Sequence, residues 1–242
     1  MVGWAATYPS LMLCWCAPLL GAPEMCPILK LDHQVDDFEV NGRGTAPEWA
    51  AAEWVVLERV GEGRSTYATR AKVLWSQTGL YFLVDCEDRQ LTCTMTEDYD
   101  EIFREDVVEV FLWPDESQAL YFEYEISPLE VELPILIPNR NGVFMGWRPW
   151  RYVGERKIRK ATSVRGGKKA LMAPAEGWMA EFFIPFALLP GLGNVPPKPG
   201  SRWRGNIYRI DYDEAPASHW AWSPVTSPSF HSYREFGTLV FA

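Results

Sequence analysis

The stretch that decides the fold is REDVVEVFLW, residues 104–113. Successive side chains of a β-strand point to opposite sides of the sheet. One face of this strand would carry Asp106, Val108, Val110 and Leu112, and the other Val107, Glu109, Phe111 and Trp113. Both faces are mostly apolar, so both are expected to be buried. An unpaired buried carboxylate costs on the order of several kcal/mol. Asp106 and Glu109 should therefore lie at a rim open to water, or have a metal, an arginine or a ligand hydroxyl group as partner.

Similar apolar stretches, separated by turn residues, occur along the rest of the chain. They predict further strands at 66–76, 80–88, 119–128, 178–186, 202–213 and 237–242, with a turn at 139–142. Helix signals are confined to residues 46–56 and 184–192. Many short strands with Gly, Pro and Asp turns predict an all-β fold, a single β-sandwich of antiparallel sheets of jelly-roll-like or immunoglobulin-like type.

Length and composition support one domain with a large core. The chain has 242 residues, of which 48% are hydrophobic, and it contains 12 tryptophans. Aromatic side chains at this density serve either a core or a sugar-binding surface, on which pyranose rings stack, and composition alone does not separate these two uses. The net charge of −9 disfavours a nucleic acid or an anionic membrane surface as partner.

The first 27 residues are expected to be a leader or an upstream extension that lies outside the domain, which we place at residues 28–242. The apolar run at 11–22 resembles the core of a secretory signal, and would favour an extracellular or periplasmic location. Neither basic residues before it nor a clean cleavage site after it are present, and an upstream extension preceding a true start at Met25 is an equal alternative. No apolar stretch is long enough for a transmembrane helix.

Five cysteines are present, namely Cys14, Cys16, Cys26, Cys86 and Cys93. Their number is odd and they form no CxxC pair, so a zinc site is not indicated. Cys86 and Cys93 are close enough in sequence to pair across a loop, but free thiols are the default expectation. The three histidines, His33, His219 and His231, are scattered and give a weak metal signal.

Carboxylates provide the stronger chemical signal. Asp106 with Glu109, and Glu123 with Glu125, lie on strands that are expected to pair. Such acids are most often solvated or structural, but they also accept hydrogen bonds from sugar hydroxyl groups, and a pair of them can serve a glycosidase. The acidic loop at 98–106 offers Asp98, Asp100 and Asp106 as oxygen ligands for calcium, without EF-hand spacing.

The ordered series of these pieces resembles the family 9 carbohydrate-binding modules, and more closely their stand-alone, family-9-like branch. The series runs KVLWSQTGLYFLVDCED, REDVVEVFLWPDE, YFEYEISP, GWMAEFFIPFALL, GSRWRGNIYRIDYD and FHSYREFGTLVF, within residues 36–242. The resemblance implies a β-sandwich that binds sugar, takes part in polysaccharide catabolism, and usually catalyses nothing. Members of the family bind calcium, which, where present here, would stabilise a loop and do no chemistry, and no other cofactor is expected.

The resemblance also implies a site. In the family, two aromatic rings clamp a terminal sugar, and the matching positions here hold Phe103 and Phe230, with His231 adjacent. A carboxylate on the acidic strand binds hydroxyl groups, and its match is Glu109. Further polar positions, which complete the same site or line its rim, hold Glu125, Ser127, Arg209 and Asp211.

This chain departs from the family pattern at several of these positions. The clamp rings are typically tryptophans and are phenylalanines here. The polar pair on the following strand is typically Arg and Asn, and is Glu125 and Ser127 here, so an acceptor replaces a donor. The glucan specificity of the family is therefore not carried over. Trp147 and Trp150 would either extend the aromatic platform or lie in the core.

Three functions follow as hypotheses. The first is non-catalytic carbohydrate binding, the second is a glycoside hydrolase, and the third is a haem-binding electron-transfer sandwich, which would need axial Met or His ligands.

Overall fold

A computed structural model describes residues 26–32, 34–226 and 229–242. Most of the predicted leader, together with Cys14, Cys16, Met25 and His33, lies outside the described residues. Among the residues that are described, no helix is long and apolar enough to cross a membrane.

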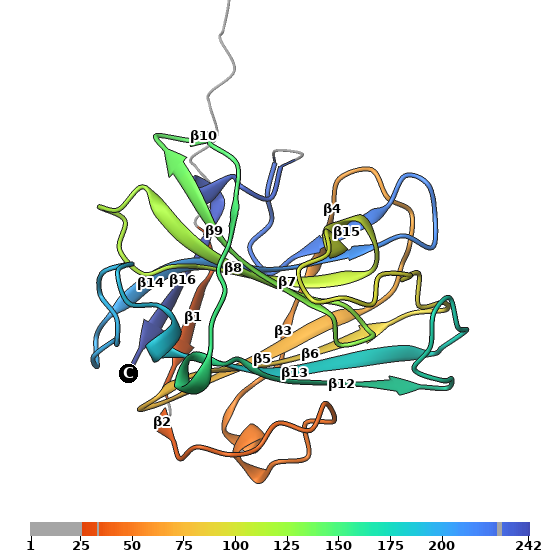
Figure 1. Cartoon of the computed structure of the whole chain (residues 1–242), viewed down its shortest axis with the longest axis horizontal. Coiled ribbons are helices and arrows are strands. Elements are labelled where there is room, and N and C mark those ends of the chain that lie inside the picture. The colour runs from red at the N-terminus through yellow and green to blue at the C-terminus, as the bar shows by residue number, and fades with distance from the viewer. Residues whose placement is uncertain (1–25, 33, 227–228) are drawn as a thin grey trace, which may run out of the picture.

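The chain folds into two stacked sheets, which Figure 1 shows edge-on. In the ten-stranded sheet, the main path is β1 (Ile28–Leu31), β16 (Gly237–Phe241), β14 (Arg202–Asp211), β7 (Val107–Trp113), β8 (Leu120–Ile126), β9 (Glu132–Arg140) and β10 (Val143–Phe144). Attached to this path are β11 (Arg148–Pro149), β15 (Ser218–Ala221) and β4 (Glu58–Val60). The six-stranded sheet contains β12 (Arg159–Arg165), β13 (Gly177–Pro185), β6 (Gly79–Glu87), β5 (Thr69–Ser76), β2 (Gln34–Val35) and β3 (Val55–Val56).

The described helical residues form five short 3₁₀ turns and no α-helix. These turns are η1 (Pro47–Ala51), η2 (Ile102–Arg104), η3 (Gly154–Arg156), η4 (Phe186–Leu188) and η5 (Tyr233–Glu235). Two of them, η1 and η4, lie within the segments 46–56 and 184–192, where helix signals were found in the sequence. The predicted all-β sandwich is confirmed, with one addition. Two strand pairs, β1 with β16 and β2 with β5, are parallel, whereas the other pairs are antiparallel.

The stretch at residues 104–113 has two buried faces, as the alternation of its side chains predicts. Val108, Val110 and Leu112 pack into the main core between the two sheets. Val107, Phe111 and Trp113 pack into a second cluster on the outer face of the same sheet. Asp106 precedes β7, and Glu109 lies at its centre on the outer face. The two acids therefore lie on opposite sides of one sheet.

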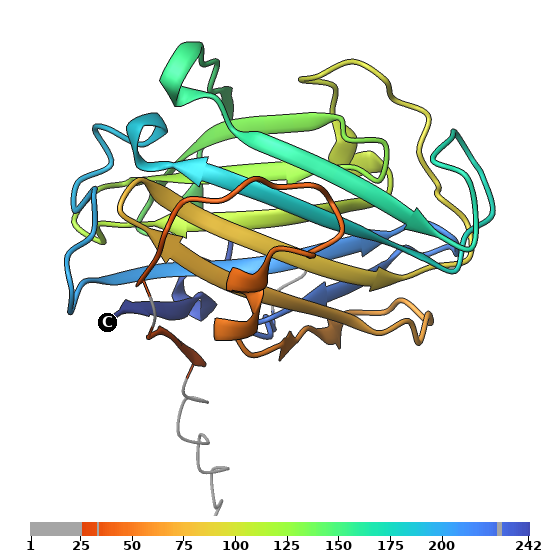
Figure 2. The same cartoon turned by 90° about the horizontal axis from the view of Figure 1, so that it is seen from below.

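The outer face of each sheet is covered by chain. Figure 2 looks onto the six-stranded sheet, which the segment around η1 crosses, and Phe38 and Trp49 from that segment pack on Tyr81 and Phe183. On the ten-stranded sheet the cover consists of β10, the segment after it and the residues around η5. This second cover leaves a cavity.

Two thiols are buried inside the sandwich. Cys86 and Cys93 are both free, as expected, and burial raises the pKa of each to about 12. They are therefore uncharged, unreactive members of the core at neutral pH.

Candidate functional site

A cavity of about 330 Å³ lies on the outer face of the ten-stranded sheet, within the range of roughly 300–1,000 Å³ that is typical of small-molecule sites. Its lining is formed by aromatic rings, three glutamates, two histidines and two isoleucines. These residues are Phe103, Glu109, Phe111, Glu123, Glu125, Ile135, Phe144, Trp147, Ile210, His219, Phe230 and His231.

One wall of the cavity is set by the antiparallel register of β7 and β8. Glu109 lies directly opposite Glu125, and Phe111 lies opposite Glu123. Residues two apart on a strand share a face, so all three carboxyl groups project from the same side of the sheet. One oxygen of each lies within 4.8 Å of the other two. The three acids therefore form one wall and do not face each other across a gap.

One side of the cavity is built by the β9–β10 hairpin. Its two-residue loop is Asn141-Gly142, with φ of 55° and 90°, the positive values that a tight type I′ hairpin turn requires. The hairpin brings Phe144 over the sheet, where its ring stacks on His231 with centroids 4.2 Å apart. Trp147 follows in the same segment.

Next to the hairpin lies the loop that carries Phe230 and His231, which three hydrogen bonds fix to the sheet. Tyr208 donates its hydroxyl to the carbonyl of Phe230 at 3.1 Å, and Asn139 donates to the carbonyl of His231 at 3.3 Å. Tyr121 Oη lies 2.9 Å from His231 Nδ1. The ring of Phe230 stacks on Tyr208 with centroids 4.0 Å apart. The aromatic rings are therefore held in place.

Phe103 reaches the cavity from η2. Tyr212, which follows β14, donates its hydroxyl to the Phe103 carbonyl at 2.8 Å. Phe103 and Phe230 thus line the same cavity from different loops, and both are only partly buried.

The three glutamates are buried without a cation. Their side chains belong to residues that are 0–4% exposed. Both carboxyl oxygens of Glu125 and the Oε2 atom of Glu123 have no hydrogen-bond partner in the described part of the chain. Burial raises the pKa of Glu109 to about 8. Burial, followed by repulsion from the neighbouring acids, raises the pKa of Glu123 and of Glu125 well above the ordinary value.

His231 does not supply the missing charge. Its Nδ1 lies 4.0 Å from Glu123 Oε2, but burial lowers the pKa of the imidazole to about 4. Burial also lowers the pKa of His219. Both rings are therefore neutral at pH 7, and no lysine or arginine is among the residues that line the cavity.

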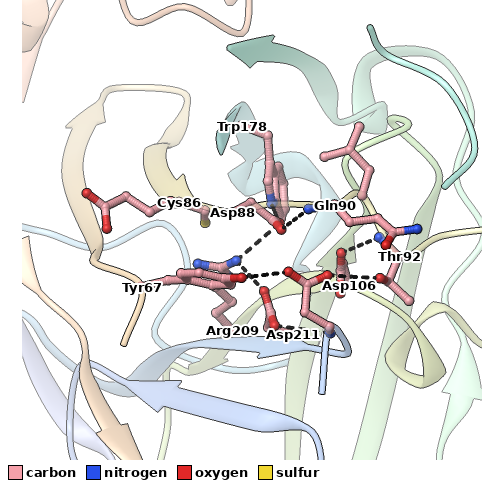
Figure 3. Close-up of polar contacts among 12 residues, drawn as sticks. Tyr67, Cys86, Asp88, Gln90, Thr92, Asp106, Trp178, Arg209 and Asp211 are labelled. Atoms are coloured by element: carbon pink, nitrogen blue, oxygen red, sulfur yellow. Dashed lines mark hydrogen bonds and ion pairs between the residues drawn. The ribbon is translucent and has the colours of Figure 1, made fainter. Parts of the chain in front are cut away.

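Arg209 and Asp211 lie on the other face of the sheet, which corrects the prediction that they line the same rim. Tyr208 is the residue of β14 that pairs with Glu109, so its neighbour Arg209 points into the sandwich. There Arg209 contacts Asp211 at 2.7 Å and Asp88 at 3.2 Å (Figure 3). All three residues are at most 3% exposed.

The same buried network contains Asp106. Its carboxylate accepts backbone hydrogen bonds from Thr92 at 2.6 Å and Tyr212 at 2.8 Å, and it lies near Asp88 and Asp211 (Figure 3). Asp106 is therefore one of two buried acids that the opening stretch required to have partners, and its partners are within the protein.

The three aspartates predicted as calcium ligands do not form one set. Asp98 pairs with Lys160 at 2.8 Å, and Asp100 accepts a hydrogen bond from the Glu97 backbone at 3.3 Å. Asp106 belongs to the buried network, because it starts the strand that enters the sandwich. The three predicted ligands are therefore divided between the loop and the buried network.

Ser127 is also outside the cavity lining. It is buried, and its hydroxyl accepts a hydrogen bond from Val131 at 3.3 Å in the turn between β8 and β9. Trp147 lines the cavity, whereas Trp150 packs against the core and donates to the Leu188 carbonyl at 2.9 Å. The alternatives left open for the two tryptophans are thus both realised, one for each residue.

Five of the proposed sugar-binding residues meet at the cavity, namely Phe103, Glu109, Glu125, Phe230 and His231. Phe144 and His219 were not identified from the sequence. The Asn-Gly pair at 141–142 is a strong hairpin signal, and a hairpin at this position would have placed Phe144 over the sheet. Glu123 was seen as a candidate acid, and the alternation of β8 already places it beside Glu125.

Comparison with known proteins agrees with this architecture. The family described as Carbohydrate family 9 binding domain-like matches residues 40–135, which include β7 and β8, so the resemblance indicated by the sequence is confirmed. No curated protein matches the chain.

Solved structures match over most of the chain. A putative carbohydrate-binding protein from Bacteroides uniformis has a TM-score of 0.73 and 16% identity, over 90% of this chain and 100% of that one. Two structures of a family 9 carbohydrate-binding module from Caldicellulosiruptor kristjanssonii both have TM-scores of 0.61. The one with cellotriose is 13% identical over 88% and 93% of the two chains, and the one with glucose is 14% identical over 89% and 95%. At these identities the likeness shows the fold.

Proposed function

We propose that this chain is a non-catalytic carbohydrate-binding module, and that the cavity on the ten-stranded sheet is its sugar site. The observation that carries the proposal is the combination, in one cavity, of fixed aromatic rings with buried carboxyl groups. Rings provide flat apolar surfaces for the C–H faces of a pyranose, and carboxyl groups accept hydrogen bonds from its hydroxyl groups. Structures of the same fold have been solved with cellotriose and with glucose bound.

The arrangement of the acids supports binding over hydrolysis. A glycosidase needs two carboxyl groups that flank the scissile bond, roughly 5–10 Å apart. Here Glu109, Glu123 and Glu125 lie side by side on one wall, with one oxygen of each within 4.8 Å of the others. A sugar bound above this wall has no carboxyl group on its far side among the residues that line the cavity. In the cell, such a module would hold a polysaccharide end for degradation by other enzymes.

The proposal is tested by titrating the purified protein with a panel of mono- and oligosaccharides in a calorimeter. We expect saturable binding to at least one class of sugar, and no release of reducing sugar from any polysaccharide that binds. Absence of binding across neutral, acidic, N-acetylated and amino sugars would contradict the proposal. Release of reducing sugar would replace it with the hydrolase.

A further inference from the structure

The cavity offers few hydrogen-bond donors to a neutral sugar. Among the described residues that line it, none is a lysine, arginine, asparagine or glutamine. Among these lining residues, the side-chain nitrogen groups are the imidazoles of His219 and His231 and the indole of Trp147, and Nδ1 of His231 is already engaged with Tyr121 at 2.9 Å. A protonated carboxyl group supplies a single O–H donor, and an ionised carboxylate supplies none. The site is thus rich in acceptors and poor in donors.

The acceptors are also unsatisfied. Glu125 is 0% exposed and Glu123 is 4% exposed, yet three of their four carboxyl oxygens have no hydrogen-bond partner in the described chain. Both residues line the cavity. Leaving buried carboxyl groups without partners is costly. A ligand that brings its own positive charge and several N–H donors would satisfy them.

The remaining walls also suit a cation. Phe103, Phe111, Phe144, Trp147 and Phe230 surround the acids. Aromatic faces attract ammonium groups through their quadrupoles, and this attraction increases when the ammonium is removed from water. Calcium is a poorer fit, because it takes about six to eight oxygen ligands, whereas the lining beyond the three glutamates is aromatic, aliphatic or imidazole.

We propose that the cavity selects a sugar that carries a protonated amine, an amino sugar such as glucosamine or the chain end of chitosan. The ammonium group would lie against Glu109, Glu123 and Glu125, and the ring would lie against the aromatic walls. This inference rests on the proposed function, because the aromatic walls and acids alone do not distinguish a sugar from another organic cation.

Binding of a cation to this wall should be linked to proton release. With its pKa raised to about 8, Glu109 is mostly protonated at pH 7, and the pKa values of Glu123 and Glu125 are also raised well above the ordinary value. An ammonium group favours their ionised forms, so protons leave when it binds. A neutral sugar has no such effect. The titratable groups that face the three acids are Tyr121, Tyr208, Tyr212, His219 and His231, of which the tyrosines keep their protons at pH 7 and the histidines are neutral.

The experiment is a calorimetric titration near pH 7 with glucosamine, N-acetylglucosamine and glucose, and with the oligosaccharides of chitosan, chitin and cellulose. Each is run in two buffers of different protonation enthalpy, so that proton release is measured directly. We expect the free amine to bind at least about tenfold more tightly than its N-acetylated or neutral counterpart, the effect of one charge-assisted contact. We also expect it alone to release protons.

Two variants locate the effect. Glu125→Gln should reduce the preference for the free amine several-fold and decrease the number of protons released. Glu62→Gln, an exposed residue after β4, makes the same change in net charge and should leave both quantities unchanged. Thermal melts show whether each variant is folded, and Glu109→Gln serves as a second site variant if Glu125→Gln does not fold.

The outcomes separate this inference from the proposed function. Equal or tighter binding of glucose or N-acetylglucosamine would overturn the selection of an amine, while the sugar-binding function would stand. Binding of no sugar at all would overturn both. A titration with calcium alone that shows binding abolished by Glu125→Gln, without any binding of amino sugar, would assign the acids to a metal and also overturn the inference.

Discussion

A cluster of three buried acids lies on each side of the ten-stranded sheet, and the surroundings of the two clusters differ. On the inner side, Asp88, Asp106 and Asp211 are grouped with Arg209 and with backbone N–H donors. On the outer side, Glu109, Glu123 and Glu125 share a cavity with aromatic rings and have no cation. The inner set is satisfied within the protein, whereas the outer set is not.

The effect of a cation can be followed within the inner set. Burial is the largest cause of the raised pKa in all three aspartates. Asp211 and Asp88, which contact Arg209, are raised to about 6 and about 7, while Asp106, which does not contact it, is raised to about 9. The outer glutamates have no arginine to offset burial. The ammonium group that we propose as ligand would do on the outer side what Arg209 does on the inner side.

The largest effect that we predict comes from removing the inner cation. Arg209→Met should lower the free energy of unfolding by roughly 3–5 kcal/mol, because it leaves buried carboxylates without their partner. The measurement is urea unfolding at about pH 7. Arg202→Met changes an exposed arginine on the same strand and should alter stability by no more than about 0.5 kcal/mol. A similar small change in both variants would show that Arg209 is not needed to hold the inner acids.

The outer acids should make stability depend on pH. In the unfolded chain Glu109 loses its proton near its ordinary pKa of 4.5, but in the folded protein it keeps the proton until about pH 8. Between these pH values the folded state binds more protons than the unfolded state. The contribution of Glu109 to the free energy of unfolding is therefore fully present below about pH 4.5 and is lost as the pH rises towards 8. The raised pKa values of the inner aspartates act in the same direction.

The contribution of Glu109 is isolated by substitution. Unfolding free energies of the wild type and Glu109→Gln, measured at several pH values between about 5 and 8, should differ in slope by about one proton, or roughly 1.4 kcal/mol per pH unit. Glu62→Gln should keep the slope of the wild type. Identical slopes for the wild type and Glu109→Gln would mean that Glu109 is ionised in the folded state at neutral pH.

Strands whose apolar residues alternate were predicted from the sequence. Strands that contain prolines or several charged residues were missed. The strand β9 was missed because Pro134 and Pro138 interrupt it, and proline is rare inside sheets. The strand β12 was missed because its charged residues read as a solvated loop, although they suit the edge position that it occupies.

The resemblance to the family and the alternation of side chains along the strands predicted part of the site. Glu109 and Glu125 could be placed on one wall because their strands are joined by a short turn. Arg209 was assigned to the wrong face because a slip of one residue in register reverses the side to which a side chain points. Nothing in the sequence fixes the register of β14 against β7, since the two strands are far apart along the chain.

The third prediction concerns affinity on the outer side. Glu109→Gln should weaken binding of the cognate sugar by roughly 1–3 kcal/mol, the range for a hydrogen bond to a charged group. Arg209→Lys, which keeps a charge on the inner side, should leave the affinity unchanged. The measurement is calorimetric titration of both variants. If Glu109→Gln retained full affinity and instead abolished the cleavage of a glycoside, the module would be a hydrolase.

The smallest effect that we predict comes from a single ring. Phe230→Ala should weaken sugar binding several-fold, or about 1 kcal/mol, by analogy with the energy of an aromatic pair. The substitution should not unfold the domain, because Phe230 is only partly buried and its loop stays attached through its own backbone carbonyl to Tyr208.

Trp54→Ala removes a partly buried ring elsewhere, under Arg70 next to the six-stranded sheet, and is the matched control. Because binding is weakened only at the cavity, the control should keep full affinity. Equal affinity of the wild type and Phe230→Ala, with both folded, would show that the ring of Phe230 does not contact the sugar.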